Sequence, residues 1–228
     1  MRPRKHATAP EVILDIDRSD RTGLDEAVFC AGKSVDQIVH ILQRVRTAGR
    51  SILLTRCSPE QIRQLPTSVR RDLDYDPVSG TGIYRGVRRE KVRGTVAVVA
   101  AGTSDLPVSR EASRTLLYYG VTVLEVTDVG VAGLWRLLDR IDDIRRADVV
   151  IAVAGMEGAL PTVLGGLLES PIVAVPTSVG YGVAAGGTAA LHAMLASCSS
   201  GMTVTNVDNG YGAACAAVRI LRVARRTR

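Results

Sequence analysis

Aromatic side chains are scarce in this sequence of 228 residues, which has one Phe, one Trp and six Tyr, or 4% in all. Hydrophobic residues still make up 46% of the chain, enough for a sizeable core that Ala, Val and Leu must fill. Proteins that bind nucleic acids combine basic stripes with aromatic stacking platforms, and we find no such stripe here. The sequence therefore argues against a nucleic-acid partner.

The chain also lacks net positive charge outside its two ends. The formal net charge is +6, but eight Arg and Lys residues lie within residues 2–5 and 219–228. Without them, 21 basic residues stand against 23 acidic ones, so the body of the chain is nearly neutral. We expect the basic tails to be solvated, which gives no basic binding face.

The chain has no apolar run long enough to cross a bilayer, and residues 1–12 are too charged for a signal peptide. Its four Cys residues form no CxxC pair and no metal-binding spacing. We therefore predict a cytoplasmic protein with reduced thiols and no membrane partner.

A small N-terminal α/β domain is predicted over residues 1–93, including its linker. A strand or turn and a helix are expected over 27–49, where Ser34 and Gln37 form a capping box. A strand over 51–55 and a short helix over 58–65 follow. Residues 73–94 are rich in charge and turn residues and are interpreted as the linker.

Residues 94–228 alternate between buried strands and helices and are predicted to form the catalytic domain. This order predicts a parallel sheet wrapped by helices, of the flavodoxin/Rossmann-like kind. Strands, all expected to be buried, are predicted over residues 95–102, 121–126, 148–155, 171–177 and 202–208. Ligands bind such sheets beyond the carboxyl ends of the strands, so the loops there are the candidate site.

The loop after the first of these strands offers groups that suit a phosphate. Gly102 is followed by the hydroxyls of Thr103 and Ser104 and by a helix N-terminus with free amides. Asp105 either holds a ribose hydroxyl or only caps the helix. The loop is neither a Walker motif nor GxGxxG, so it does not specify a general nucleotide binder.

Four further loops supply candidate residues. Glu157 stands between glycines in a way that suggests close approach of a ligand, although a Glu at a helix start also favours the helix dipole. The glycine-rich segment 176–187 is long enough to wrap an anion with backbone amides, or is only a flexible connection. The remaining candidates for substrate binding are Asp128, Gly155, Met156, Gly158, Ser178, Gly186, Gly187, Asn206, Asp208 and Asn209.

Cys198 lies where a helix is expected to end. Most lone cysteines are small buried hydrophobes, and the helix dipole at this end disfavours a thiolate. The residues alone therefore leave both a packing role and a nucleophilic role open.

The motifs AGTSDLPVSREA, DVGVAG, VAGMEGAL, VPTSVGYG and NVDNGYGA, in this order, closely resemble the LarB family. That family contains the carboxylase/hydrolase that starts nickel-pincer cofactor biosynthesis, and its catalytic half is similar to aminoimidazole ribonucleotide carboxylases. The resemblance is dense over residues 95–217. The segments DRTGLDEAVFCAGKSVDQIVHIL and LLTRCSPEQ also resemble the family's small leading domain.

The resemblance implies carboxylation of the pyridinium ring of nicotinate adenine dinucleotide with CO2 or bicarbonate, and release of AMP. It implies that Cys198 attacks the ring, that Glu157 is the acid/base, and that the chain forms a homo-octamer. Mg2+ is the expected metal for the phosphoanhydride, with Asp105, Asp128 or Asp208 as possible ligands. A thiolate fits this chemistry because it can add to an electron-poor ring and leave again.

The sequence departs from the family at two positions. Trp135 stands where His is expected, and His192 stands where an aliphatic residue is expected. The nearest alternative is a purine-pathway carboxylase or mutase, but the His-Arg-Thr-Pro loop of those enzymes is absent. A non-catalytic nucleotide sensor is the other alternative, and it would need neither Cys198 nor Glu157.

Overall fold

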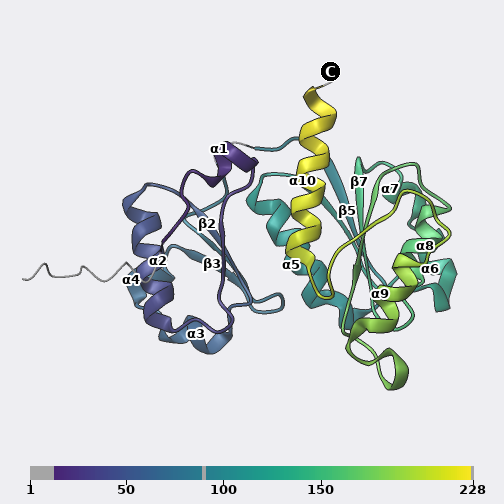
Figure 1. Cartoon of the computed structure of the whole chain (residues 1–228), viewed down its shortest axis with the longest axis horizontal. Coiled ribbons are helices and arrows are strands. Elements are labelled where there is room, and N and C mark those ends of the chain that lie inside the picture. Colours follow the sequence, from purple (N-terminus) through teal and green to yellow (C-terminus); the bar gives the residue numbers. More distant parts are fainter. Residues whose placement is uncertain (1–12, 89–90, 227–228) are drawn as a thin grey trace, which may run out of the picture.

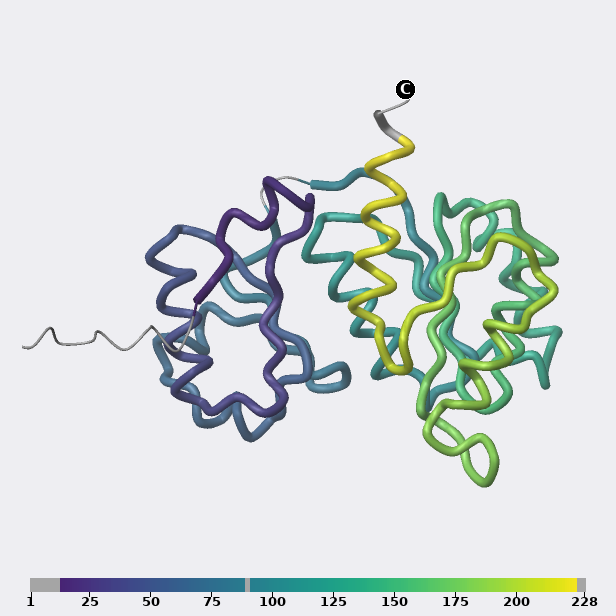
Figure 2. Tube along the Cα trace, viewed as in Figure 1, coloured from purple at the N-terminus to yellow at the C-terminus, as the bar shows by residue number. Residues whose placement is uncertain are grey.

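The computed structural model describes residues 13–88 and 91–226, which form two β-sheets separated by helices (Figure 1). We call residues 13–88 the N-terminal unit and residues 91–226 the C-terminal unit. Helices α5 (Leu106–Tyr118) and α10 (Gly210–Arg226) lie between the two sheets, and Figure 2 shows the same layering along the chain trace. Each sheet also has helices on its outer side.

The C-terminal unit contains the predicted parallel sheet, with strand order β6-β5-β7-β8-β9. Every pair of neighbouring strands is parallel. The strands are β5 (Thr95–Ala100), β6 (Thr122–Val126), β7 (Val149–Ala154), β8 (Ile172–Pro176) and β9 (Thr203–Val204). Strands β7 and β8 are buried throughout, and β5 is buried from its second residue. The edge strands β6 and β9 are only partly buried, so the prediction of five buried strands is wrong there.

Helices cover both faces of this sheet. Helices α5 and α10 lie on the face toward the N-terminal unit. The other face carries α6 (Leu134–Leu138), α7 (Ile141–Ile144), α8 (Leu160–Gly165) and α9 (Thr188–Leu195). Short 3-10 turns η1 (Thr103–Asp105), η2 (Val131–Gly133) and η3 (Gly182–Gly187) occupy the loops at the carboxyl ends of strands. The fold thus places the candidate loops along one edge of the sheet.

The N-terminal unit is a mixed sheet with strand order β1-β2-β4-β3. Its strands are β1 (Ala27–Phe29), β2 (Ile52–Thr55), β3 (Leu73–Asp76) and β4 (Thr81–Tyr84). Its helices are α1 (Arg18–Thr22), α2 (Val35–Thr47), α3 (Pro59–Gln64) and α4 (Thr67–Arg70). The predicted capping box of Ser34 and Gln37 is confirmed at the start of α2.

The predicted linker over 73–94 is wrong in its first half, because residues 73–84 form an antiparallel hairpin of β3 and β4. The turn is fixed by Asp76, whose carboxylate accepts hydrogen bonds from the backbone and hydroxyl of Ser79. Gly82 lets the Leu73 side chain pack closely, since a Cβ there would lie 2.9 Å from it. The turn residues that suggested a linker are those that a hairpin requires.

The two units share one apolar core. Leu53 and Ile83 of the N-terminal sheet pack in the same cluster as Leu116 of α5 and Val218 of α10. Polar contacts border this core: the Tyr118 hydroxyl donates to the Asp25 carboxylate at 2.8 Å. Helix α5 therefore packs in a core that both sheets share.

The predicted solvation of the basic tails is wrong for Arg222, whose guanidinium donates to the Gly23 carbonyl. Residues 2–5 and 228 lie outside the described residues, as do the side chains of Arg225 and Arg226. Within residues 13–88 and 91–226, we find no helix that is both long and apolar enough to cross a membrane.

Candidate functional site

A cavity of about 340 Å³ opens at the carboxyl edge of β5, β6 and β7. The structure brings seven of the predicted site residues together around it. They are Gly102, Ser104, Asp105, Asp128, Gly155, Met156 and Glu157. The side chains of Thr103 and Ser104 are exposed beside the first turn of α5. The amides of Gly102, Asp105 and Leu106 at this turn already donate hydrogen bonds within the chain, so the predicted phosphate contact depends on the two hydroxyls and the remaining amides.

Asp105 joins the cavity wall to the end of β8. It is 3% exposed, and its two carboxylate oxygens accept hydrogen bonds from the Gly102 amide at 2.9 Å and the Thr177 hydroxyl at 2.6 Å. Burial raises the pKa of the Asp105 carboxyl, although these hydrogen bonds oppose that effect. The structure thus gives Asp105 a positioning role that includes the predicted capping contact, since its carboxylate accepts from the N-cap amide of η1 as well as from Thr177. A contact with a ribose hydroxyl stays a prediction.

Substitution of Asp105 should cost stability, because alanine leaves the Gly102 amide and the Thr177 hydroxyl without their acceptor. We expect Asp105→Ala to lower the free energy of unfolding by about 2 kcal/mol. Asp105→Asn should cost less, since an amide can accept from Gly102 and donate to Thr177. Urea denaturation measures both, with the exposed carboxylate of Asp128 changed to Asn as the control. Three equal values would refute the positioning role.

The pH dependence of this effect has a definite sign. Because the pKa of Asp105 is raised above its ordinary value of 3.8, the folded state holds this proton to higher pH than the unfolded chain. The stability that Asp105 contributes is complete below 3.8 and is lost as pH rises through its folded-state pKa. As pH rises from 4, the parent protein should therefore lose stability relative to Asp105→Asn, so that the advantage of the parent in the free energy of unfolding becomes smaller. A constant difference would contradict the raised pKa.

Glu157 is exposed in the loop between β7 and α8. The glycines around it are explained by packing within the chain. A Cβ at Gly155 would lie 2.3 Å from the Val179 carbonyl oxygen, and one at Gly158 would lie 3.0 Å from the Ala190 carbonyl oxygen. Met156 has a positive φ of 52°, and such strain in a non-glycine residue is often found at functional sites. The loop is thus held in one conformation that presents Glu157 at the cavity.

Asp128 reaches the same cavity from the end of β6. It also has a positive φ, of 59°, and its carboxylate pairs with the Arg136 guanidinium at 2.8 Å. Arg136 lines the cavity as well, so it is a site residue that the sequence analysis missed. Its neighbour Trp135 is 67% exposed.

A second group of predicted residues lies on the loops after β8 and β9. The Asp208 carboxylate accepts a hydrogen bond from the Ser178 amide at 2.8 Å, which joins the two loops. Asn209 caps α10 through the Gly212 amide at 2.8 Å. The Asn206 side chain accepts from the Val207 amide, 2.9 Å away. None of these residues lines the cavity described above.

The segment 178–187 projects from the body of the C-terminal unit (Figure 2). Gly186 and Gly187 both have positive φ, and a Cβ at Gly187 would also lie 2.7 Å from the Thr177 carbonyl oxygen. Glycine is therefore required at the base of this loop for the chain itself, independently of any anion.

Cys198 is the exposed one of the four cysteines, and the other three are buried. It follows α9 by three residues, as predicted. The preceding Ser197 hydroxyl lies 2.7 Å from that of Thr162 in α8, and the Ser199 amide donates to Ser197 at 3.1 Å. The turn that carries the thiol is thus attached to the helix that follows the Glu157 loop, although Cys198 does not line the cavity.

The described residues offer no ready set of ligands for the expected Mg2+. The described residues contain no group of three His, Cys, Asp or Glu side chains placed to hold a metal ion. Asp105, Asp128 and Asp208 each accept hydrogen bonds or pair within the chain. These residues do not fit a resident metal, so Mg2+ stays a prediction and we assign no step to it.

The parallel sheet, covered by helices on both faces and with a cavity at the carboxyl ends of its strands, defines a doubly wound α/β protein of the Rossmann/flavodoxin-like class. Comparison with known proteins is more specific. Residues 95–227 match the AIR carboxylase family, and residues 8–86 match the LarB/PurE-like N-terminal domain.

Two relatives come from Methanocaldococcus jannaschii. The uncharacterized protein MJ0165 is 37% identical over 219 residues, covering 92% of this chain and 84% of that protein. An N5-carboxyaminoimidazole ribonucleotide mutase is 31% identical over 133 residues, covering 55% of this chain and 78% of the mutase. The chain belongs to the AIR carboxylase family, in its LarB-like branch. This membership supports a carboxylase-family role and confirms the predicted resemblance and fold class.

Proposed function

We propose that this protein carboxylates C5 of the pyridinium ring of nicotinate adenine dinucleotide and hydrolyses its phosphoanhydride. The products would be AMP and pyridinium-3,5-biscarboxylate mononucleotide. The observation that carries the proposal is the placement of Cys198 and Glu157. The exposed thiol lies on a turn fixed to α8, and the carboxylate lies at the cavity in the loop that leads into the same helix.

The proposed reaction uses sulfur to reverse the polarity of the ring. The Cys198 thiolate adds to a ring carbon, which breaks aromaticity and makes C5 an enamine carbon that attacks CO2. Glu157 then takes the C5 proton, and loss of the thiolate restores the aromatic ring. Dividing one difficult substitution into such steps is covalent catalysis. The cationic ring also favours the thiolate, which offsets the helix dipole near Cys198.

The loops suggest where the substrate lies. A cavity of about 340 Å³ is at the small end for ligand pockets, so it suits part of a dinucleotide. Thr103 and Ser104, with the start of α5, would hold a phosphate. The rest of the substrate would extend toward Ser178 and the loop after β9. Hydrolysis of the phosphoanhydride requires water, and we assign no residue to its activation.

The positions of the histidines argue against the purine-pathway alternative. His40 lies in the N-terminal unit, and His192 is exposed on α9. His6 lies outside the described residues. The residues that line the cavity include Glu157 and no histidine. A proton-handling histidine of the purine-carboxylase kind would therefore have to come from elsewhere, for instance from a second copy of the chain.

A homo-octamer in the cytoplasm remains part of the proposal. Tyr181 and Val183 support contacts between copies, since they are 78% and 99% exposed on the projecting loop. Sedimentation of the purified chain tests this directly, and a monomer at all concentrations would contradict it.

The experiment that tests the proposal offers the purified protein two substrates in parallel, with bicarbonate and Mg2+ present. One is nicotinate adenine dinucleotide and the other is aminoimidazole ribonucleotide, and AMP and carboxylated products are measured by chromatography. We expect AMP and a dicarboxylated mononucleotide from the first and no turnover of the second. Turnover of the ribonucleotide would favour the purine alternative. Binding of the dinucleotide without turnover would favour the sensor.

A further inference from the structure

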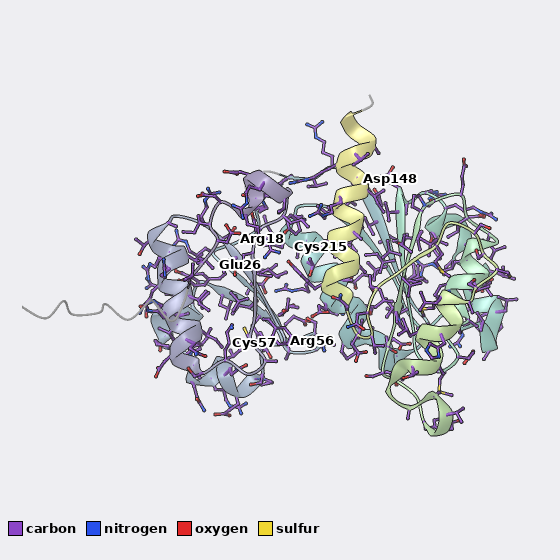
Figure 3. The ribbon with its side chains drawn as sticks, in the orientation of Figure 1. Arg18, Glu26, Arg56, Cys57, Asp148 and Cys215 are labelled. Atoms are coloured by element: carbon purple, nitrogen blue, oxygen red, sulfur yellow. The ribbon has the colours of Figure 1, made fainter. Side chains whose placement is uncertain are left out.

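Arg56 reaches from the N-terminal unit to the loop after β9. It directly follows β2 and has a positive φ of 52°, a conformation that non-glycine residues seldom adopt without support. Its guanidinium donates to the Glu111 carboxylate on α5 at 3.3 Å and to the Asp208 backbone carbonyl. Asp208 is 152 residues away along the chain, and Figure 3 shows Arg56 between the two units.

Glu111 extends this contact to the start of α10. It is 3% exposed, and its second carboxylate oxygen accepts a hydrogen bond from the Tyr211 amide at 3.1 Å. Burial raises the pKa of Glu111, and the charge of Arg56 is the largest influence that opposes it. A buried carboxylate needs a charged partner of this kind, so Arg56 stabilises the ionised form of Glu111.

Asp208 is the point where this network meets the candidate site. Its own φ is 57°, its amide donates to the Pro176 carbonyl at 2.8 Å, and its carboxylate accepts from the Ser178 amide. Arg56 therefore fixes the carbonyl of the same residue whose carboxylate joins the two loops. Three groups thus bind this one strained residue: the Arg56 guanidinium from the N-terminal unit, and the Pro176 carbonyl and the Ser178 amide from the C-terminal unit.

We propose that Arg56 is a positioning residue, through which the N-terminal unit holds residues 206–210 in the conformation that the substrate site requires. This gives the N-terminal unit a role in the reaction: it completes the C-terminal site from outside. The effect on substrate rests on the proposed function, but the effect on the loop does not. A guanidinium suits the role because its rigid planar fork of five N–H donors holds a carboxylate and a carbonyl in fixed directions, whereas an ammonium is a compact charge without that fixed geometry.

The chain offers a matched control in Arg114, which also connects the two units. Its guanidinium binds the Asp74 carboxylate at 2.9 Å and the Asp74 carbonyl at 2.8 Å. These contacts go to β3 and not to the loop after β9. Arg114→Ala therefore removes an equivalent contact between the units without touching Asp208.

The test measures amide hydrogen exchange in the full-length protein without substrate, for Arg56→Ala, Arg56→Lys and Arg114→Ala. We expect peptides spanning 206–212 to exchange about tenfold faster in Arg56→Ala, as for the loss of one charge-assisted hydrogen bond. Arg56→Lys should be intermediate and Arg114→Ala unchanged at these peptides. Equal exchange in Arg56→Ala and Arg114→Ala would overturn the proposal. If Arg56→Ala does not fold, the same comparison is made between Arg56→Lys and Arg114→Ala. Equal exchange of residues 206–212 in these two variants would then overturn the proposal.

Calorimetric titration with nicotinate adenine dinucleotide tests whether Arg56 also affects substrate binding. We expect the Kd of Arg56→Ala to rise about tenfold while kcat changes less, because the loop binds substrate and does not react. Faster exchange with an unchanged Kd would overturn the role in the site. If the parent protein itself does not bind the dinucleotide, the proposed function fails, and the exchange data still decide whether Arg56 holds the loop.

Discussion

Replacing Cys198 with alanine is expected to lower kcat for carboxylation of nicotinate adenine dinucleotide by at least about 1,000-fold, as for loss of a covalent nucleophile. The thiol is exposed, so alanine should remove little packing and the variant should fold normally. Cys198→Ser should be as inactive, since a hydroxyl neither adds to the ring nor leaves it as sulfur does. Steady-state rates from product chromatography measure both variants.

The control for this result lies two residues further along the chain. Ser200 is also exposed on the turn, and Ser200→Ala changes the same surface without removing a nucleophile. It should keep the parent rate. Binding of the dinucleotide should survive in Cys198→Ala, because the loops that we propose to hold its phosphates are elsewhere. Carboxylation by Cys198→Ala at the parent rate would exclude the proposed adduct.

Replacing Gly155 with alanine is expected to lower the free energy of unfolding by about 3 kcal/mol, the upper range for overpacking a buried site. The new Cβ would lie 2.3 Å from the Val179 carbonyl oxygen and 2.6 Å from the Thr177 hydroxyl. Neither can move easily, because Thr177 is fully buried and bonded to Asp105, and the Val179 carbonyl accepts from the Met156 amide at 2.8 Å. Chemical denaturation measures the change.

Gly166→Ala is the matched control, since its Cβ would lie 3.5 Å from the nearest atom, an ordinary contact. It should change the unfolding free energy by less than about 0.5 kcal/mol. Because Gly155 forms part of the cavity wall, Gly155→Ala should also weaken dinucleotide binding. A Gly155→Ala protein as stable as Gly166→Ala would show that the two strand ends are not held this closely.

The central strands could be predicted because apolar residues, most of them β-branched, follow one another where a strand is buried on both faces. Strands β5, β7 and β8 fit this rule. The prediction of a strand over 202–208 is wrong in length, since β9 has only two residues at its edge of the sheet. The hairpin of residues 73–84 was missed because its turn residues are also those of a linker.

The candidate site was predictable where it depends on the regular topology of the sheet and not where it depends on a specific contact between two distant residues. The edge of a parallel sheet places Asp105, Asp128 and Glu157 together by topology alone. The contact of Asp105 with Thr177 spans 72 residues, and that of Arg56 with Asp208 spans 152. No local pattern encodes such pairs. The nucleophilic role that we propose for Cys198 rests on the family resemblance, because its position near a helix end argues against an easily formed thiolate.

The most direct test of the central claim is the fate of isotope-labelled bicarbonate during turnover of nicotinate adenine dinucleotide, followed by mass spectrometry. The account predicts one labelled carboxylate in a pyridinium mononucleotide, released together with AMP, and no label in the product of Cys198→Ala. Release of AMP without any label in the pyridine product would show a hydrolase only, and would contradict the proposed carboxylation.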